Sequence, residues 1–236
     1  MYNLDISFLL PTNREPQYAW NTINSINTVA DAINTDYKYE ILVCSPTHFS
    51  GENIKYIPDN KQTGPIAAFN YMAAEIAEGQ FTVCLVDDHI AWDNDFFTFM
   101  QFLNSDFFEH GRSKITSLNT RHIPQRVPII GEDWCGGIKE NHNKRHHTTA
   151  RFPIVDQEVR IKKLQGYIFH PNFNYHAGDL WLGFYMGEEE GPVYEAPSAS
   201  IKQYIGLRNY QYEKQDCQYY HKLKLRYLKE GYKKYV

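Results

Sequence analysis

Two adjacent carboxylates and an imidazole follow an apolar run in the first half of the chain. Residues 81–86 (FTVCLV) predict a strand, and Asp87, Asp88 and His89 come directly after it. Like charges at neighbouring positions repel each other, so a positive partner is expected there. Residues i and i+2 of an extended chain project to the same side, so Asp87 and His89 can share one divalent ion. The alternative is a solvated strand end whose acids cap the next helix.

The elements that must position these residues alternate along the first hundred residues. This alternation predicts a largely parallel sheet with helices on both faces, in which ligands bind at the carboxyl ends of the strands. Apolar runs predict strands at 4–10, 39–44, 53–57 and 81–86, and helical spacing predicts helices at 16–34, 64–79 and 93–103.

Polar side chains stand at the carboxyl end of every one of these four strands. Their convergence at one sheet edge makes a ligand site more plausible than a charged turn. The residues in question are Thr12, Asn13 and Arg14, then Ser45, then Asp59, and last Asp87, Asp88 and His89.

The second half gives weaker signals. A short helix is expected over 177–187, with Leu180, Trp181 and Phe184 facing inward, and a final basic amphipathic helix over 212–230. Strands are expected at 113–120, 126–130, 164–170 and 193–197, and residues 131–149 are expected to form an irregular loop.

Composition bounds the class of protein. A chain of 236 residues, 42% hydrophobic and 22% charged, suits one globular domain. The net charge of −4 argues against a nucleic-acid binder. No apolar run reaches the length of a membrane span, and the first residues do not match a signal peptide. The four scattered cysteines lack a CxxC pair and favour reduced thiols, so a cytoplasmic location is expected.

The end of the chain is basic, because residues 201–236 hold nine Lys and Arg against three Asp and Glu. We expect the final helix to pack on the body through Tyr219, Leu223, Tyr227 and Leu228. At most, its basic face adds a peripheral contact with anionic lipid.

Four stretches in order resemble family 2 glycosyltransferases of the GT-A fold. They are ISFLLPTNREPQYAWNTINSI, YEILVCS, IKYIPDNKQTGPIAAFNYMAAEIAEGQFTVCLVDDHIAWDNDF and AGDLWLGFYMG. The resemblance implies a single GT-A domain over 1–236, with a mixed, mostly parallel sheet flanked by helices and a C-terminal helix. Residues 1–110 would form the nucleotide-sugar donor half, and residues 111–236 the acceptor half.

The resemblance also implies donor-binding roles. Pro11, Thr12 and Arg14 match the first loop, which lies along the nucleotide in the family. Ser45 stands where the family usually has an acid that reads the base, and this departure leaves the nucleobase open. Asp59, Lys61, Gly64 and Asn70 match the segment that flanks the donor.

The triplet Asp87-Asp88-His89 occupies the position of the family's DxD motif as a D-x-H variant. Asp87 and His89 would hold a divalent cation on the diphosphate, with Asp88 beside them on the ribose or the sugar. Because histidine replaces a carboxylate, Mn²⁺ is favoured over Mg²⁺.

Asp179 aligns with the family's catalytic base, although an acid that stabilises a helix start is the alternative. Glu132, Asp133 and Trp134, together with Trp181, are candidates for the acceptor side, against the alternative of a surface turn at 132–134.

The expected activity is an inverting, metal-dependent transfer of a sugar from a nucleotide-sugar donor to a hydroxyl of a glycan, lipid-linked or protein acceptor. A non-catalytic binder of sugar nucleotides or carbohydrates is the alternative. A sugar nucleotidyltransferase fits less well, because residues 11–17 (PTNREPQ) lack the glycines that grip a triphosphate.

Overall fold

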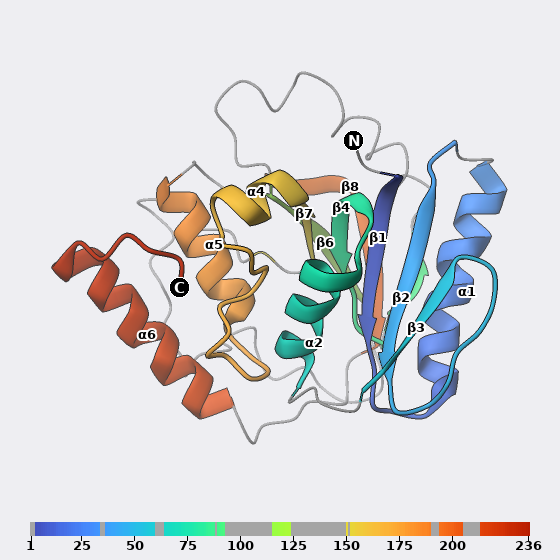
Figure 1. Cartoon of the computed structure of the whole chain (residues 1–236), viewed down its shortest axis with the longest axis horizontal. Helices are drawn as coiled ribbons and strands as arrows, with labels where there is room; N and C mark the ends of the chain where they lie inside the picture. The colour runs from blue at the N-terminus through green and yellow to red at the C-terminus, as the bar shows by residue number, and fades with distance from the viewer. Residues whose placement is uncertain are drawn as a thin grey trace.

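The protein is built on one mixed sheet, seen edge-on between its helices in the computed structural model (Figure 1). The structure describes residues 3–33, 36–59, 64–87, 89–92, 115–123, 150, 152–189, 194–204 and 213–236, and for 89–92, 115–123 and 194–204 it describes the backbone alone.

Four parallel strands form the first part of the sheet in the order β3-β2-β1-β4. They are β1 (Leu4–Pro11), β2 (Tyr39–Ser45), β3 (Ile54–Pro58) and β4 (Gly79–Cys84). All four strands predicted from the apolar runs of the first hundred residues are therefore present.

The sheet continues from β4 through strands of the second half, in the order β7-β6-β8-β5. The pairs β4–β7, β6–β7 and β5–β8 are antiparallel, whereas β6–β8 is parallel. The prediction of a mixed sheet flanked by helices is confirmed. The strands are β5 (His89–Trp92), β6 (Ile115–Ile123), β7 (Pro153–Asp156) and β8 (Tyr194–Tyr204).

Of the helices that the structure describes, one packs on the first face of the sheet. The helix α1 (Pro16–Ile33) buries Ile23, Ile26 and other apolar residues at helical spacing. They pack against the side chains of β1 that point the same way, such as Phe8 and Leu10. Leu9, between them, points to the opposite face and belongs to the other core cluster, as the two-residue period of a strand requires.

The remaining described helices pack on that opposite face (Figure 1). Buried apolar residues from all of them join one core cluster with Leu9, Leu42 and Cys84 of the sheet. The elements are α2 (Pro65–Tyr71), its continuation as a π-helix η1 (Met72–Ile76), α4 (Gln157–Lys162), α5 (Gly178–Glu189) and α6 (Glu213–Glu230).

Residues 164–170 do not form the predicted strand. The segment is irregular although Leu164, Ile168 and Phe169 are buried. The N–H groups of 164, 166 and 167 donate to nearby backbone carbonyls, and those of 168 and 169 donate to a side chain. The Tyr235 hydroxyl donates to the Ile168 carbonyl at 2.6 Å, and the Asn70 amide bonds both 168 and 169. The strand next to β4 is instead the four-residue β7, which the sequence did not reveal.

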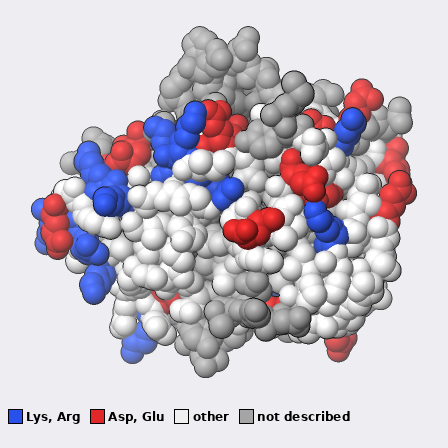
Figure 2. Space-filling view, viewed as in Figure 1, with Lys and Arg blue, Asp and Glu red and all other residues white. Residues whose placement is uncertain are grey.

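The helix α6 confirms the predicted final helix, with one difference in its packing. Leu223 and Tyr227 are buried as expected, whereas Leu228 is 56% exposed and Tyr220 takes its place in the core. Basic side chains gather over α6 at the left of Figure 2. None of the described helices is long and apolar enough to cross a membrane. The predicted helix 93–103 and strand 126–130 lie outside the described residues.

Candidate functional site

The carboxyl ends of the four parallel strands meet at one edge of the sheet. The backbone N–H of Thr12 donates to the Cys44 carbonyl at 2.9 Å, and that of Asp59 donates to the Ser45 carbonyl at 3.1 Å. On the other side of β1, β4 runs parallel to it and leads into Asp87 within three residues of its end. The ladder therefore brings Thr12, Ser45, Asp59 and Asp87 to the same edge, as the alternation of elements predicted.

Asp87 lies at the centre of a small network from the β1 loop. Its Oδ2 accepts a hydrogen bond from the Thr12 hydroxyl at 2.5 Å, and its Oδ1 lies 3.0 Å from Nη1 of Arg14. The Arg14 backbone N–H also donates to the Thr12 hydroxyl at 3.4 Å. Asp87 is only 5% exposed, so the guanidinium is the counterion that makes burial of this carboxylate tolerable.

The prediction that Asp87 ligates a metal ion stays a prediction. Its two oxygens contact Thr12 and Arg14 here, but an ionised carboxylate has about four acceptor sites and can hold a cation as well. Among the residues whose side chains the structure describes, no cluster of three His, Cys, Asp or Glu could hold a metal. Asp88 and the side chain of His89 lie outside that set.

Ser45 and Asp59 stand side by side at the ends of β2 and β3. Ser45 is 1% exposed, and its hydroxyl accepts a hydrogen bond from the Thr47 backbone N–H at 3.0 Å. The Asp59 Oδ1 is buried and has no hydrogen-bond partner in the part of the chain that the structure describes. Burial, and in second place the nearby Asp59 carboxylate, raises the pKa of the Cys44 thiol to about 12. Of Ser45 and Asp59, it is therefore Asp59 whose side chain has a buried acceptor oxygen without a hydrogen bond from the described residues.

Asn70 binds another segment of the chain through its side-chain amide. Its Oδ1 accepts hydrogen bonds from the backbone N–H groups of Ile168 and Phe169, both at 3.0 Å. Its Nδ2 donates to the Phe169 carbonyl at 2.8 Å, and the residue is 8% exposed. The amide therefore binds the irregular 168–169 segment to α2, and the donor-binding role of Asn70 stays a prediction.

Gly64, which precedes α2, allows residues 174–175 of the same chain to approach its backbone closely. Its φ is +96°, and a Cβ there would lie 2.9 Å from the Asn174 carbonyl oxygen and 3.2 Å from the Tyr175 ring. A side chain at this position would therefore collide with residues 174–175 in addition to straining the backbone. The glycine joins the predicted donor half to the segment that leads into α5.

Asp179 lies in the first turn of α5, where both predicted roles remain open. The residue is half-buried, and its Oδ1 accepts a hydrogen bond from the Leu180 backbone N–H at 2.9 Å. It follows Ala177, which has a φ of +59°, and Gly178. A Cβ on Gly178 would lie 3.1 Å from Ile66 Cδ1, so α5 starts in tight contact with α2.

Trp181 is a core residue, which corrects its prediction as an acceptor-side residue. Its side chain is 1% exposed, and its Nε1 donates to the Tyr235 carbonyl at 3.1 Å. A buried ring cannot stack on a sugar. The other acceptor candidates, Glu132, Asp133 and Trp134, lie outside the described residues, as does Lys61.

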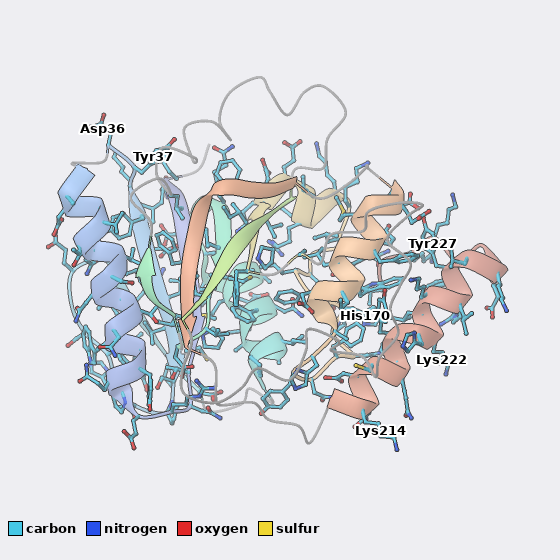
Figure 3. All side chains as sticks on the ribbon, turned by 180° about the vertical axis from the view of Figure 1, so that it is seen from behind. Asp36, Tyr37, His170, Lys214, Lys222 and Tyr227 are labelled. Atoms are coloured by element: carbon cyan, nitrogen blue, oxygen red, sulfur yellow. The ribbon has the colours of Figure 1, made fainter. Side chains whose placement is uncertain are left out.

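His170 is a buried imidazole in the same region. It lies between α5 and α6 in Figure 3, and it is 3% exposed. Its Nδ1 accepts a hydrogen bond from the Asn172 backbone N–H at 3.2 Å, and its Nε2 is 3.5 Å from the Tyr219 hydroxyl. Burial lowers its pKa to about 4, so the ring is neutral near pH 7.

Sequence reasoning missed Asp216, a buried carboxylate of α6. Its two oxygens accept hydrogen bonds from the backbone N–H groups of Asn174, Tyr175 and His176 and from the Asn174 side-chain amide. In the sequence it is one acid near the start of a basic helix, and nothing in that pattern indicates a distant partner.

The comparisons with known proteins agree with this architecture. No protein-family model matches the sequence, and no curated protein matches it. Among solved structures, the chain is similar to mannosyl-3-phosphoglycerate synthase from Rubrobacter xylanophilus, with a TM-score of 0.62 and 11% identity, over 98% of this chain and 76% of that one.

Two further structures hold ligands. GalNAc-T7 with UDP, GalNAc and Mn²⁺ matches with a TM-score of 0.59 and 13% identity over 88% of this chain and 45% of that one. Glucosyl-3-phosphoglycerate synthase from Mycobacterium tuberculosis, with Mn²⁺, UDP and phosphoglyceric acid, matches with a TM-score of 0.53 and 13% identity over 94% and 78%. The chain spans 59% of a matching Staphylococcus aureus TarS fragment. The fold is that of the GT-A nucleotide-sugar transferases.

Proposed function

We propose that the protein is an inverting glycosyltransferase, which moves a sugar from a nucleotide-sugar donor to a hydroxyl of a carbohydrate or another acceptor. The observation that carries the proposal is the ion pair between the buried Asp87 and the partly exposed Arg14 at the carboxyl edge of a GT-A sheet. That edge is where open α/β sheets bind their ligands. The polar residues at the neighbouring strand ends and the acid at the start of α5 support it.

In this proposal Arg14 supplies the positive charge on the donor diphosphate. Its side chain is 26% exposed, and Asp87 fixes the guanidinium from the buried side. A guanidinium has five N–H donors, which is more than one carboxylate can accept, and in this proposal the donors on its exposed side bind phosphate oxygens. Positive charge at this place stabilises the nucleoside diphosphate as it leaves.

Asp59 is the candidate that reads the nucleobase or the ribose. The buried Oδ1 without a partner is an acceptor for an imino, amino or hydroxyl donor of the nucleotide. Ser45, which stands at the position of the family's acid, has its hydroxyl engaged by Thr47. Because two similar structures contain UDP, we propose a UDP-sugar as the donor.

Asp179 acts as the general base in the proposed reaction. Its carboxylate takes the proton from the acceptor hydroxyl as the hydroxyl oxygen attacks the anomeric carbon. The new C–O bond forms as the bond from that carbon to the diphosphate oxygen breaks, and the diphosphate leaves with the electron pair. Attack opposite to the leaving group inverts the configuration of the anomeric carbon.

A divalent cation remains part of the proposal, with Mn²⁺ favoured over Mg²⁺. Two of the similar structures contain Mn²⁺, and His89 is of a residue type that ligates it. Asp87 and His89 remain the proposed ligands, and no step above depends on the metal. Transfer rates after EDTA treatment and after titration with Mn²⁺ or Mg²⁺ test this part separately.

Binding and turnover of a donor panel test the proposal. Thermal unfolding with UDP-, GDP-, CMP- and TDP-sugars, with and without Mn²⁺, identifies the donor by the rise in Tm. Release of the nucleoside diphosphate then measures turnover of the wild type, of Asp179→Asn and of Glu188→Gln, which changes a carboxylate near the other end of α5. We expect Asp179→Asn to lose at least about 100-fold in kcat, the usual worth of a general base, while Glu188→Gln stays near wild type.

Two results would contradict the proposal in different ways. Donor binding without turnover by the wild type would identify a non-catalytic sugar-nucleotide binder. Full transferase activity of Asp179→Asn would show that the base lies elsewhere and leave the reaction class intact.

A peripheral contact of α6 with anionic lipid also stays a proposal. Lys222 and Lys229 are exposed on the same helix as the exposed Leu225 and Leu228. Co-sedimentation with phosphatidylserine vesicles, compared with phosphatidylcholine vesicles, tests it, and Lys222→Glu should weaken any binding.

A further inference from the structure

Asp216 forms an unusually saturated carboxylate site. It is 1% exposed, and it accepts hydrogen bonds of 2.9–3.2 Å from three consecutive backbone N–H groups and one side-chain amide. No Lys or Arg side chain forms a salt bridge with it in the part of the chain that the structure describes. A buried negative charge is costly, so these donors must stay in place as long as the carboxylate is ionised.

The residues that Asp216 binds lead directly into the start of α5. Residues 174–176 are followed by Ala177, whose φ of +59° lies in the left-handed region. An L-residue pays roughly 1–2 kcal/mol there, so the conformation persists only when its surroundings hold it. The next residues are Gly178, in tight contact with Ile66, and Asp179.

The same segment contacts the donor side of the molecule. The Asn174 carbonyl and the Tyr175 ring lie against Gly64, at the distances given above. Residues 174–176 are therefore held from one side by α6 and packed on the other side against the segment that leads into α2. A displacement of this segment would move the start of α5 relative to the sheet edge that carries Arg14 and Asp87.

We propose that Asp216 is a positioning residue for the reaction: by binding the N–H groups of residues 174–176, it sets the place of the Asp179 carboxylate relative to the donor. This inference rests on the proposed function, because it assigns Asp216 a role through Asp179. Asp216 itself touches neither substrate nor the reacting atoms.

The variant Asp216→Asn tests the inference, because the amide removes the charge and turns one acceptor oxygen into a donor that faces N–H groups. We expect kcat to fall about 10- to 100-fold, the loss associated with misplacing a catalytic group by up to about 1 Å. The donor Kd should change less than threefold, because the donor contacts come from β1 to β4. Amide hydrogen exchange at residues 174–176 should accelerate.

Glu40→Gln is the matched control. Glu40 is 7% exposed and accepts hydrogen bonds from the Ser7 hydroxyl at 2.7 Å and the Glu78 backbone N–H at 2.8 Å. It lies at the amino end of β2, away from the carboxyl edge. The Glu40→Gln variant should have a lower free energy of unfolding, as Asp216→Asn should, but its kcat should be unchanged. If Asp216→Asn does not fold, Asn174→Ala removes one donor and should lower kcat in the same direction by a smaller factor.

The outcomes separate the two proposals. If the wild type is active and Asp216→Asn is equally active, the positioning role is overturned and the proposed glycosyltransferase activity is not. The same conclusion follows from a fully active Asn174→Ala if Asp216→Asn does not fold. Equal kcat losses in Asp216→Asn and Glu40→Gln also overturn it, because the effect would then be general destabilisation. A folded wild type that turns over no donor refutes the proposed function, and the catalytic role of Asp216 with it.

Discussion

The Arg14–Asp87 pair makes the sharpest prediction about the site, because Asp87 is buried and lies 3.0 Å from the Arg14 guanidinium. The perturbation is a double-mutant cycle of Arg14→Met and Asp87→Asn. Arg14→Met keeps much of the apolar stem and removes the charge. Asp87→Asn keeps the shape of the side chain and removes the opposite charge.

The expected coupling follows from the burial of the two groups. The charges lie 3.0 Å apart, with the side chains 26% and 7% exposed. Exposed pairs contribute up to about 1 kcal/mol, whereas breaking a buried pair costs about 3–5 kcal/mol. A pair with one buried partner falls between these limits, so we expect a coupling of about 2 kcal/mol in the free energy of unfolding. Arg14→Met should be the more damaging single change, because it leaves the buried carboxylate without its guanidinium counterion.

Urea unfolding of the four proteins at pH 7 measures the coupling. The donor that raises the wild-type Tm is then titrated against each protein. Both single variants should weaken donor binding at least about tenfold, because Arg14→Met removes the charge at the diphosphate and Asp87→Asn no longer fixes the guanidinium there. A coupling below about 0.5 kcal/mol would refute the view that Asp87 stabilises Arg14. Donor binding unchanged in Arg14→Met would refute its place at the diphosphate.

Three further predictions concern the framework around the site. The pKa of His170 is about 4 in the folded protein against 6.5 for the unperturbed group, so the unfolded chain binds a proton at higher pH than the folded protein does. The free energy of unfolding should therefore fall as the pH drops from 6.5 towards 4, by about 3 kcal/mol at pH 4. His170→Phe should abolish that part of the pH dependence in urea unfolding. Asn70→Ala leaves two buried N–H groups unpaired and should cost about 3 kcal/mol in the same assay, and a loss below 1 kcal/mol would contradict its structural role. Gly64→Ala should cost at least about 1 kcal/mol more than Gly231→Ala, since both have positive φ but only Gly64 would bring a Cβ against the Asn174 carbonyl; equal losses would exclude the steric contribution.

The four parallel strands and α1 could be predicted from the sequence because their signals are local. Apolar runs of five to eight residues that end at polar residues are sufficient to indicate β1 to β4. Apolar residues three or four positions apart are sufficient to indicate α1. The convergence of Thr12, Ser45, Asp59 and Asp87 followed from that alternation alone, because parallel strands share their carboxyl edge.

The rest of the site depends on contacts between distant residues, which one sequence does not reveal. The apolar segment 164–170 has the composition of a strand, yet the side chain of Asn70, about a hundred positions earlier, bonds its backbone instead. Asp87 and Arg14 are each plausible ligand-binding residues in isolation, and only the fold pairs them. Trp181 was predicted on the acceptor side and is buried because the segment after α6 folds back over it.

The ladder between β4 and β7 has a mechanical consequence. It joins the strand that leads into Asp87 to the strands of the second half, through the pairs Phe81–Asp156 and Val83–Ile154. A hinge between the predicted donor and acceptor halves would have to break these backbone hydrogen bonds inside a continuous sheet, where Val83 and Ile154 are at most 1% exposed. Domain closure of the kind that brings two lobes together around a substrate would therefore require this part of the sheet to break. If the protein is the glycosyltransferase proposed above, the continuous sheet holds its donor and acceptor sides at a constant separation during the reaction.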